Sequence, residues 1–233
     1  MSRRFFNLSE AFPIVFLRSK DISTPPEIYG FLAGDLIKAS IMNVKSTGIP
    51  SEEECYEIIA EMGMLENIIA HSHQVQRVSL FIVDHLMNEN LDRELVGAAA
   101  LLHDITKTKS LQTKEDHAKT GEILLAAKGY PETGTIVGQH VFISKCFPEG
   151  KITEAEVVNY ADKRVVHDSV VSLEERMNYI LKRYGGTPER RQLLTLLWER
   201  SKRLENKIFK KLPFKPDELG FLLDSKGLED SHK

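Results

Sequence analysis

The stretch Leu101-Leu102-His103-Asp104-Ile105-Thr106-Lys107 decides how this sequence is interpreted. It closes an alanine-rich helical pattern that begins at Arg93, so His103 and Asp104 are expected at the end of a buried helix. A carboxylate buried in such a place is costly unless it is paired, protonated or bound to a metal. Titratable residues on the apolar faces of other helices are therefore the candidates to surround Asp104.

Several of those faces carry a histidine or an aspartate. Each helical residue advances by about 100°, which places His71 on the stripe of Ile68 and Val75 and turns His73 toward solvent. The same phasing turns three further residues inward: His117, His140 and Asp162. No arginine or lysine is expected on those faces. We therefore expect a divalent cation to neutralise the carboxylates and to bind neutral imidazoles.

From Ser51 onward the chain reads as a succession of helices. Ser51 and Glu54 have the spacing of a capping box, which predicts a helix over residues 51–63. Further helices are predicted over residues 65–88, 93–103, 115–128, 132–142, 154–168, 173–184 and 188–209. No stretch alternates between apolar and polar residues for long enough to predict a sheet. The expected fold is an all-α bundle with the metal site in its core.

The texture of the sequence divides the chain into three regions. Residues 1–50 hold four prolines and one predicted helix over 27–42, and residues 51–211 form the helical domain. Residues 212–233 are expected to be a partly disordered tail. The sequence leaves open whether the first region covers the site, mediates dimerisation or packs on the bundle.

Composition narrows the choice of partners. Hydrophobic residues make up 42% and charged residues 28% of the chain, and the net charge is -3. Nucleic-acid binders usually carry a basic excess, so no nucleic-acid partner is expected. No apolar run approaches the length of a membrane helix, and Cys55 and Cys146 are read as incidental thiols in a reducing compartment. We expect a cytoplasmic protein without a membrane partner; its oligomeric state stays open, a homodimer included.

Three segments resemble the motifs of the HD superfamily of metal-dependent phosphohydrolases. Residues 67–72 resemble its first motif, and residues 101–107 resemble the defining His-Asp motif, with Thr106 where a glycine is usual. Residues 160–165 resemble the last motif. A lone His-Asp pair carries no weight, as His167-Asp168 in the same chain shows. The ordered set on inward faces is specific, and the similarity spans roughly residues 51–185.

The resemblance implies a metal site of an HD-domain helical bundle. Its first site would be made of four residues: His71, His103, Asp104 and Asp162. His117 and His140 match the additional histidines of two-metal members, in which Asp104 would bridge both ions. This order of ligands is similar to that of HD-type diadenosine tetraphosphate hydrolases. Alternatively, the two histidines support or contact the substrate of a one-metal enzyme. Iron, manganese, cobalt and zinc would all suit the ligands.

Such a centre implies hydrolysis by a metal-activated water. Asp104 and Lys107 are the predicted catalytic residues. Three cations are candidates to bind substrate phosphate, although each has a surface role as its alternative: Lys107, Lys163 and Arg164. His167 is a weaker candidate for an acid that protonates a leaving group.

The expected function is hydrolysis of a phosphoester or phosphoanhydride bond in a small phosphorylated substrate of the nucleotide type. Two other functions stay open. One is a di-iron HD-fold oxygenase, because a fold does not fix a reaction. The other is a metal-bearing regulatory protein that binds nucleotides without turnover. The sequence chooses neither the substrate nor the metal.

Overall fold

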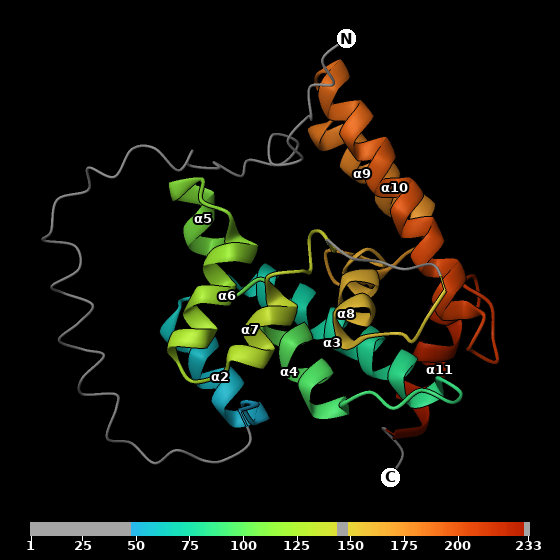
Figure 1. Cartoon of the computed structure of the whole chain (residues 1–233), viewed down its shortest axis with the longest axis horizontal. Coiled ribbons are helices and arrows are strands. Elements are labelled where there is room, and N and C mark those ends of the chain that lie inside the picture. The colour runs from blue at the N-terminus through green and yellow to red at the C-terminus, as the bar shows by residue number, and fades with distance from the viewer. Residues whose placement is uncertain (1–47, 144–148, 231–233) are drawn as a thin grey trace, which may run out of the picture.

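A computed structural model describes residues 48–143 and 149–230 of the chain. Within those ranges it is helical apart from one short hairpin (Figure 1). The helices are α2 (Glu52–Glu61), α3 (Glu66–His85), α4 (Arg93–Leu102), α5 (Lys107–Thr113), α6 (His117–Ala127), α7 (Pro131–Val137), α8 (Glu154–Asp162), α9 (Leu173–Tyr184), α10 (Pro188–Phe209) and α11 (Leu219–Asp230). The all-α prediction is confirmed. The helix predicted over 27–42 and Cys146 lie outside the described residues.

Side-chain caps fix where the helices begin. Ser51 and Glu54 form the predicted capping box of α2, and boxes of the same kind open α8 and α9. Each box satisfies two backbone N–H groups that have no partner inside the helix. The first turns of these helices are therefore specified locally.

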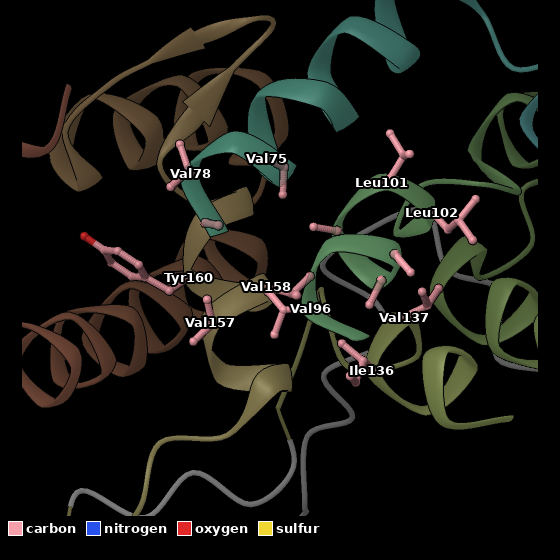
Figure 2. Close-up of a cluster of buried hydrophobic side chains, with 14 of the residues drawn as sticks. Val75, Val78, Val96, Leu101, Leu102, Ile136, Val137, Val157, Val158 and Tyr160 are labelled. Atoms are coloured by element: carbon pink, nitrogen blue, oxygen red, sulfur yellow. The ribbon is translucent and has the colours of Figure 1, made fainter. Parts of the chain in front are cut away.

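The core lies where α3, α4, α7 and α8 meet. Figure 2 shows Val75 and Val78 of α3, Leu102 of α4 and Val158 of α8 among its buried side chains. These side chains are fully buried, and burying each stabilises the fold by roughly 1.5 to 3 kcal/mol. The same four helices also carry or adjoin most of the predicted ligands, so apolar packing sets the positions of the ligand backbones.

Helices α9 and α10 lie side by side and extend from the bundle as a hairpin (Figure 1). They share a small apolar cluster of their own: Leu173, Met177, Ile180 and Leu194. A buried ion pair docks α10 onto α8, since the Lys207 ammonium lies 2.7 Å from both carboxylate oxygens of Glu156. The long helix is thus anchored at its C-terminal half.

Two helices end five or more residues before their predicted ends. The helix expected over 154–168 ends at Asp162, and the chain turns into a hairpin of β1 (Val165–Val166) and β2 (Ser169–Val170). The β-branched valines favour extended backbone, and His167 turns the chain with a φ of 56°. The helix expected over 132–142 ends at Val137, and α5 is not among the predicted helices.

The tail that was expected to be partly disordered contains an ordered helix in its described part. Leu212, Leu219 and Leu223 belong to the main core, and α11 covers residues that the sequence reading left without structure. The spacing of Leu219 and Leu223 is helical, but two leucines are a weak signal at the end of a chain.

Two further features concern the cysteine thiol and the length of the apolar helices. The Cys55 thiol is buried, and this burial, with Glu54 and Glu52 nearby, raises its pKa to about 12, which suits an unreactive thiol. Within the described ranges, no helix has the length and apolar character needed to cross a membrane.

We expect Lys207→Ala to lower the free energy of unfolding by about 3 to 5 kcal/mol, because it removes the cation that faces the buried Glu156 carboxylate. Arg203→Ala, at an exposed position four residues earlier on α10, is the matched control and should change it by less than about 0.5 kcal/mol. Denaturant unfolding measures both. Equal losses in the two variants would contradict this assignment of α10.

Candidate metal centre

The structure brings all six predicted ligands to one place in the bundle. They come from five helices, either within the helix, at one of its ends or just after it. His71 lies within α3, His103 and Asp104 directly follow α4, His117 opens α6, His140 follows α7, and Asp162 closes α8. The helix phasing that selected His71 is therefore consistent with the structure, while His73 lies against Tyr56 of α2, with 5.6 Å between ring centroids.

Four of the residues form what we call the first ligand group: His71, His103, Asp104 and Asp162. His71 Nε2 lies 3.1 Å from Asp162 Oδ1, and His103 Nε2 lies 3.4 Å from Asp104 Oδ2. His103 Nε2 and Asp162 Oδ1 are 3.9 Å apart. Nitrogen and oxygen ligands held at about 2.0 to 2.2 Å from one ion lie roughly 3.0 to 3.6 Å apart. Two of these separations fall in that range and the third is slightly longer.

Asp104, His117 and His140 form the second ligand group. Asp104 Oδ1 lies 3.2 Å from His117 Nε2 and 3.5 Å from His140 Nε2, and the two nitrogens are 3.1 Å apart. Asp104 thus directs one carboxylate oxygen at each group. A carboxylate in this position can bridge two ions.

Backbone carbonyls set the orientation of three imidazoles. In each ring Nδ1 faces a carbonyl oxygen at 2.7 to 2.9 Å, and the pairs are His71 with His167, His103 with Ala100, and His140 with Val137. A carbonyl oxygen only accepts, so Nδ1 carries the proton and Nε2 presents a lone pair to the centre. This is the tautomer that metal ligation through Nε2 requires.

Two buried atoms of the centre have unmet bonding capacity. His103 Nε2 and Asp104 Oδ1 make no hydrogen bond of acceptable geometry with any described residue. A buried polar atom without a partner costs about 1 to 3 kcal/mol, and more when it is charged. A divalent cation in each ligand group would give both atoms a partner, so the residues present fit a metal.

Electrostatics keeps the carboxylates ionised. Burial alone would raise the pKa of Asp104, but Lys107 and His103 outweigh it and hold that pKa well below its usual range. The pKa of Asp162 is likewise well below its usual range, because His71, Arg176 and Lys163 outweigh its burial.

The imidazoles respond to the same surroundings. Burial lowers the pKa of His140 to about 4, which keeps that ring neutral at physiological pH. Burial also works against protonation of His103, but the Asp104 carboxylate raises its pKa overall. The space beside His103 Nε2 therefore attracts positive charge.

The expectation that no lysine or arginine neutralises these carboxylates is wrong. Lys107 Nζ lies 2.6 Å from Asp104 Oδ2, and Arg176 Nη2 lies 3.5 Å from Asp162 Oδ1. Lys163 Nζ is 3.9 Å from Asp162 Oδ2. Lys163 directly follows Asp162, Lys107 comes three residues after Asp104, and Arg176 comes from α9, so none shares the helix face on which the prediction was based.

The three predicted phosphate-binding cations have different surroundings. The Lys107 side chain is 35% exposed and reaches the centre. Lys163 is enclosed and donates to the carbonyl oxygens of His140 and Asn159, so it holds the turn that carries His140. Arg164 is also buried, but it points to other protein groups, among them the carbonyl of Val171. The structure does not bring Arg164 to the centre.

Local packing explains why α6 and α7 can bring two histidines together. A Cβ on Gly134 would lie 2.8 Å from the backbone oxygen of Glu122, and one on Gly121 would lie 2.9 Å from Val137. Only glycine permits this approach of the two helices. Thr106, which stands where the HD motif usually has glycine, donates from Oγ1 to the His117 carbonyl and so ties the His-Asp turn to α6.

Two residues near the centre were not predicted. Asn159 donates from Nδ2 to the carbonyls of Gln139 and His140, which steadies the His140 turn from α8. Its position one turn before Asp162 was the available signal. Arg176 lies outside every motif, and its position depends on how α9 packs.

We expect His71→Ala to lose bound metal, because it removes a ligand whose Nε2 faces the centre. His73→Ala, two residues away on the same helix, should keep its metal. Elemental analysis of both purified variants is the measurement. Loss of metal from His73→Ala with full occupancy in His71→Ala would reverse the phasing of α3.

We expect His117→Ala and His140→Ala each to reduce bound metal from two equivalents toward one, because each removes a nitrogen of the second ligand group. Metal titration of each variant, with circular dichroism to confirm folding, measures the change. Unchanged stoichiometry would rule out a second ion.

Comparison with known proteins matches one segment of the chain to a known domain. Residues 68–165 match the HD domain family, a segment that contains all six candidate ligands. The chain is also similar to a tRNA (cytidine(56)-2'-O)-methyltransferase of Picrophilus torridus, with 29% identity over 143 residues. That alignment covers 56% of this chain and 40% of the relative, so the chain spans less than half of that protein. No solved structure matches the chain. Residues 68–165 therefore form an HD domain, and this segment contains a His/Asp cluster suited to a divalent metal.

Proposed function

We propose that this protein hydrolyses a phosphoester or phosphoanhydride bond of a small, nucleotide-type substrate with a metal-activated water. The observation that carries the proposal is the position of Asp104. Its carboxylate is 1% exposed, and its two oxygens face two separate groups of imidazoles. Such an arrangement suits a hydrolytic centre with two ions.

The ligand set suits iron, manganese, cobalt or zinc. Such an ion, when bound, lowers the pKa of its water toward neutrality and so makes hydroxide available. The chain's own residues supply the rest. Asp104 and the oriented imidazoles hold the centre, and Lys107 is the catalytic cation that neutralises charge on a phosphate oxygen. Burial lowers the pKa of Lys107, but Asp104 and Asp162 raise it more, so its ammonium stays charged.

A small substrate is favoured over nucleic acid. The similar methyltransferase acts on tRNA by its name, but this chain covers 40% of that protein. The net charge of -3 gives no general attraction for a polyanion. A nucleotide brings a compact phosphate to the centre without needing a basic surface. We propose that the reaction takes place in the cytoplasm, which is consistent with the buried free thiol of Cys55.

A di-iron oxygenase is the second candidate, because the two ligand groups share Asp104 and could hold a coupled iron pair. The two reactions have different requirements. Hydrolysis of a phosphate ester proceeds without oxygen, whereas an oxygenase consumes it. Anaerobic assay of the purified protein with a panel of nucleotides distinguishes them directly.

We expect Asp104→Ala to lose both bound metal and hydrolysis. Activity should fall by more than roughly a hundredfold, because even the outer partners of metal ligands are worth up to about that much. Asp217→Ala, at an exposed position outside the HD segment, is the control and should keep both. Metal analysis and phosphate release are the measurements.

Two results would contradict the proposed function. The first is a metal-loaded wild-type protein that binds nucleotide but cleaves no phosphoester in the panel, which would indicate a regulatory protein. The second is oxygen consumption by an iron-loaded protein without anaerobic hydrolysis, which would indicate the oxygenase.

A further inference from the structure

Arg176 lies at the edge of the first ligand group although it falls outside the segment that matches the HD family. It belongs to the second turn of α9, and its Nη2 lies 3.5 Å from Asp162 Oδ1. Its side chain is 14% exposed, so the guanidinium is largely withdrawn from solvent. An arginine in this position faces the same space as the metal ligands.

One donor of this guanidinium has no acceptor. Arg176 Nε is buried and finds no hydrogen-bond partner within residues 48–143 and 149–230. Arg164 provides an internal comparison, because its Nε, Nη1 and Nη2 donate to the Val171 carbonyl, the Tyr160 hydroxyl and the Pro216 carbonyl. All three guanidinium nitrogens of Arg164 thus have acceptors within the protein, which indicates a structural role for this arginine. The fold leaves Arg176 with a buried donor that needs an acceptor.

A series of contacts holds Arg176 beside the centre. Its guanidinium lies 5.9 Å from the centroid of the Tyr179 ring, and that ring meets the His167 ring at 5.7 Å between centroids. The His167 carbonyl accepts from Nδ1 of His71. The β1–β2 hairpin and α9 therefore build one wall of the site together. Such a wall restricts the conformations open to the arginine side chain.

The charges around this wall favour an anion. Lys107 lies beside Asp104, as Arg176 lies beside Asp162. The two carboxylates lie on the same imidazole, because His103 Nε2 is 3.4 Å from Asp104 Oδ2 and 3.9 Å from Asp162 Oδ1, so the two cations border one small site. Two cations in one small volume repel, and a bound anion that contacts both relieves that repulsion.

We propose that Arg176 binds a phosphate oxygen of the substrate through Nε and a terminal nitrogen, next to Lys107. Phosphate is the favoured anion because the planar guanidinium fork matches two of its oxygens. This assignment rests on the proposed phosphohydrolase function. It implies that α9 contributes to specificity for phosphorylated substrates. The competing role, neutralisation of Asp162 alone, needs a positive charge but no fork.

The test uses the metal-loaded protein and inorganic phosphate as the probe. Arg176→Lys keeps the charge and removes the fork, and Arg176→Gln removes both. Arg183→Gln is the matched control, because Arg183 is an exposed arginine of the same helix that contacts Tyr184. Calorimetric titration gives the dissociation constant for phosphate, and metal analysis with thermal unfolding shows whether each variant is comparable to wild type.

We expect both Arg176 variants to bind phosphate about tenfold more weakly or worse at unchanged metal content, while Arg183→Gln binds like wild type. KM for the hydrolysed substrate should rise in Arg176→Lys. Wild-type affinity in Arg176→Lys would overturn the proposal, as would loss of metal from both variants, since either result assigns Arg176 to Asp162 alone. If wild type binds phosphate but cleaves no substrate, the proposed function fails, while the titration still decides the role of Arg176.

Discussion

The carboxylate of Asp104 is the constraint on which the rest of this structure depends. It is buried at the end of α4, and burial of an ionised carboxylate is tolerated only where other groups offset the lost hydration. Lys107 and the imidazoles of His103, His117 and His140 surround it. The fold therefore buries a charge at a cost in hydration free energy, and the groups that offset this cost come from helices far apart in the sequence.

The surrounding backbone makes that arrangement specific. Carbonyl groups fix the tautomers of three imidazoles, so their free nitrogens face the centre before any ion arrives. The early end of α8 is part of this design, because the hairpin that follows brings the His167 carbonyl to His71. The close approach of α6 and α7 at Gly134 likewise brings His117 and His140 together. The packing that buries the Asp104 carboxylate, at a cost in hydration free energy, therefore also orients the imidazoles around it.

Sequence reasoning recovered what depends on helical periodicity. Helix phasing placed the candidate ligands in the core, since residues such as His71 and Asp162 recur with the apolar stripes that pack α3 and α8. It failed where tertiary packing decides. Nothing local separates Lys163, which supports the His140 turn, from Arg164, which points elsewhere. The position of Arg176 depends on how α9 packs against the bundle. The end of a helix, such as the early end of α8, is likewise not indicated by helical periodicity.

The central claim is that a cation, rather than ordinary internal hydrogen bonding, brings these six groups together. Anomalous X-ray diffraction from crystals of the wild-type protein, purified without chelators, tests it most directly. We expect anomalous density between the Nε2 atoms and the Asp104 carboxylate, with one peak for each ligand group. Crystals without such peaks, in which water or hydrogen bonds alone link the six side chains, would contradict the claim.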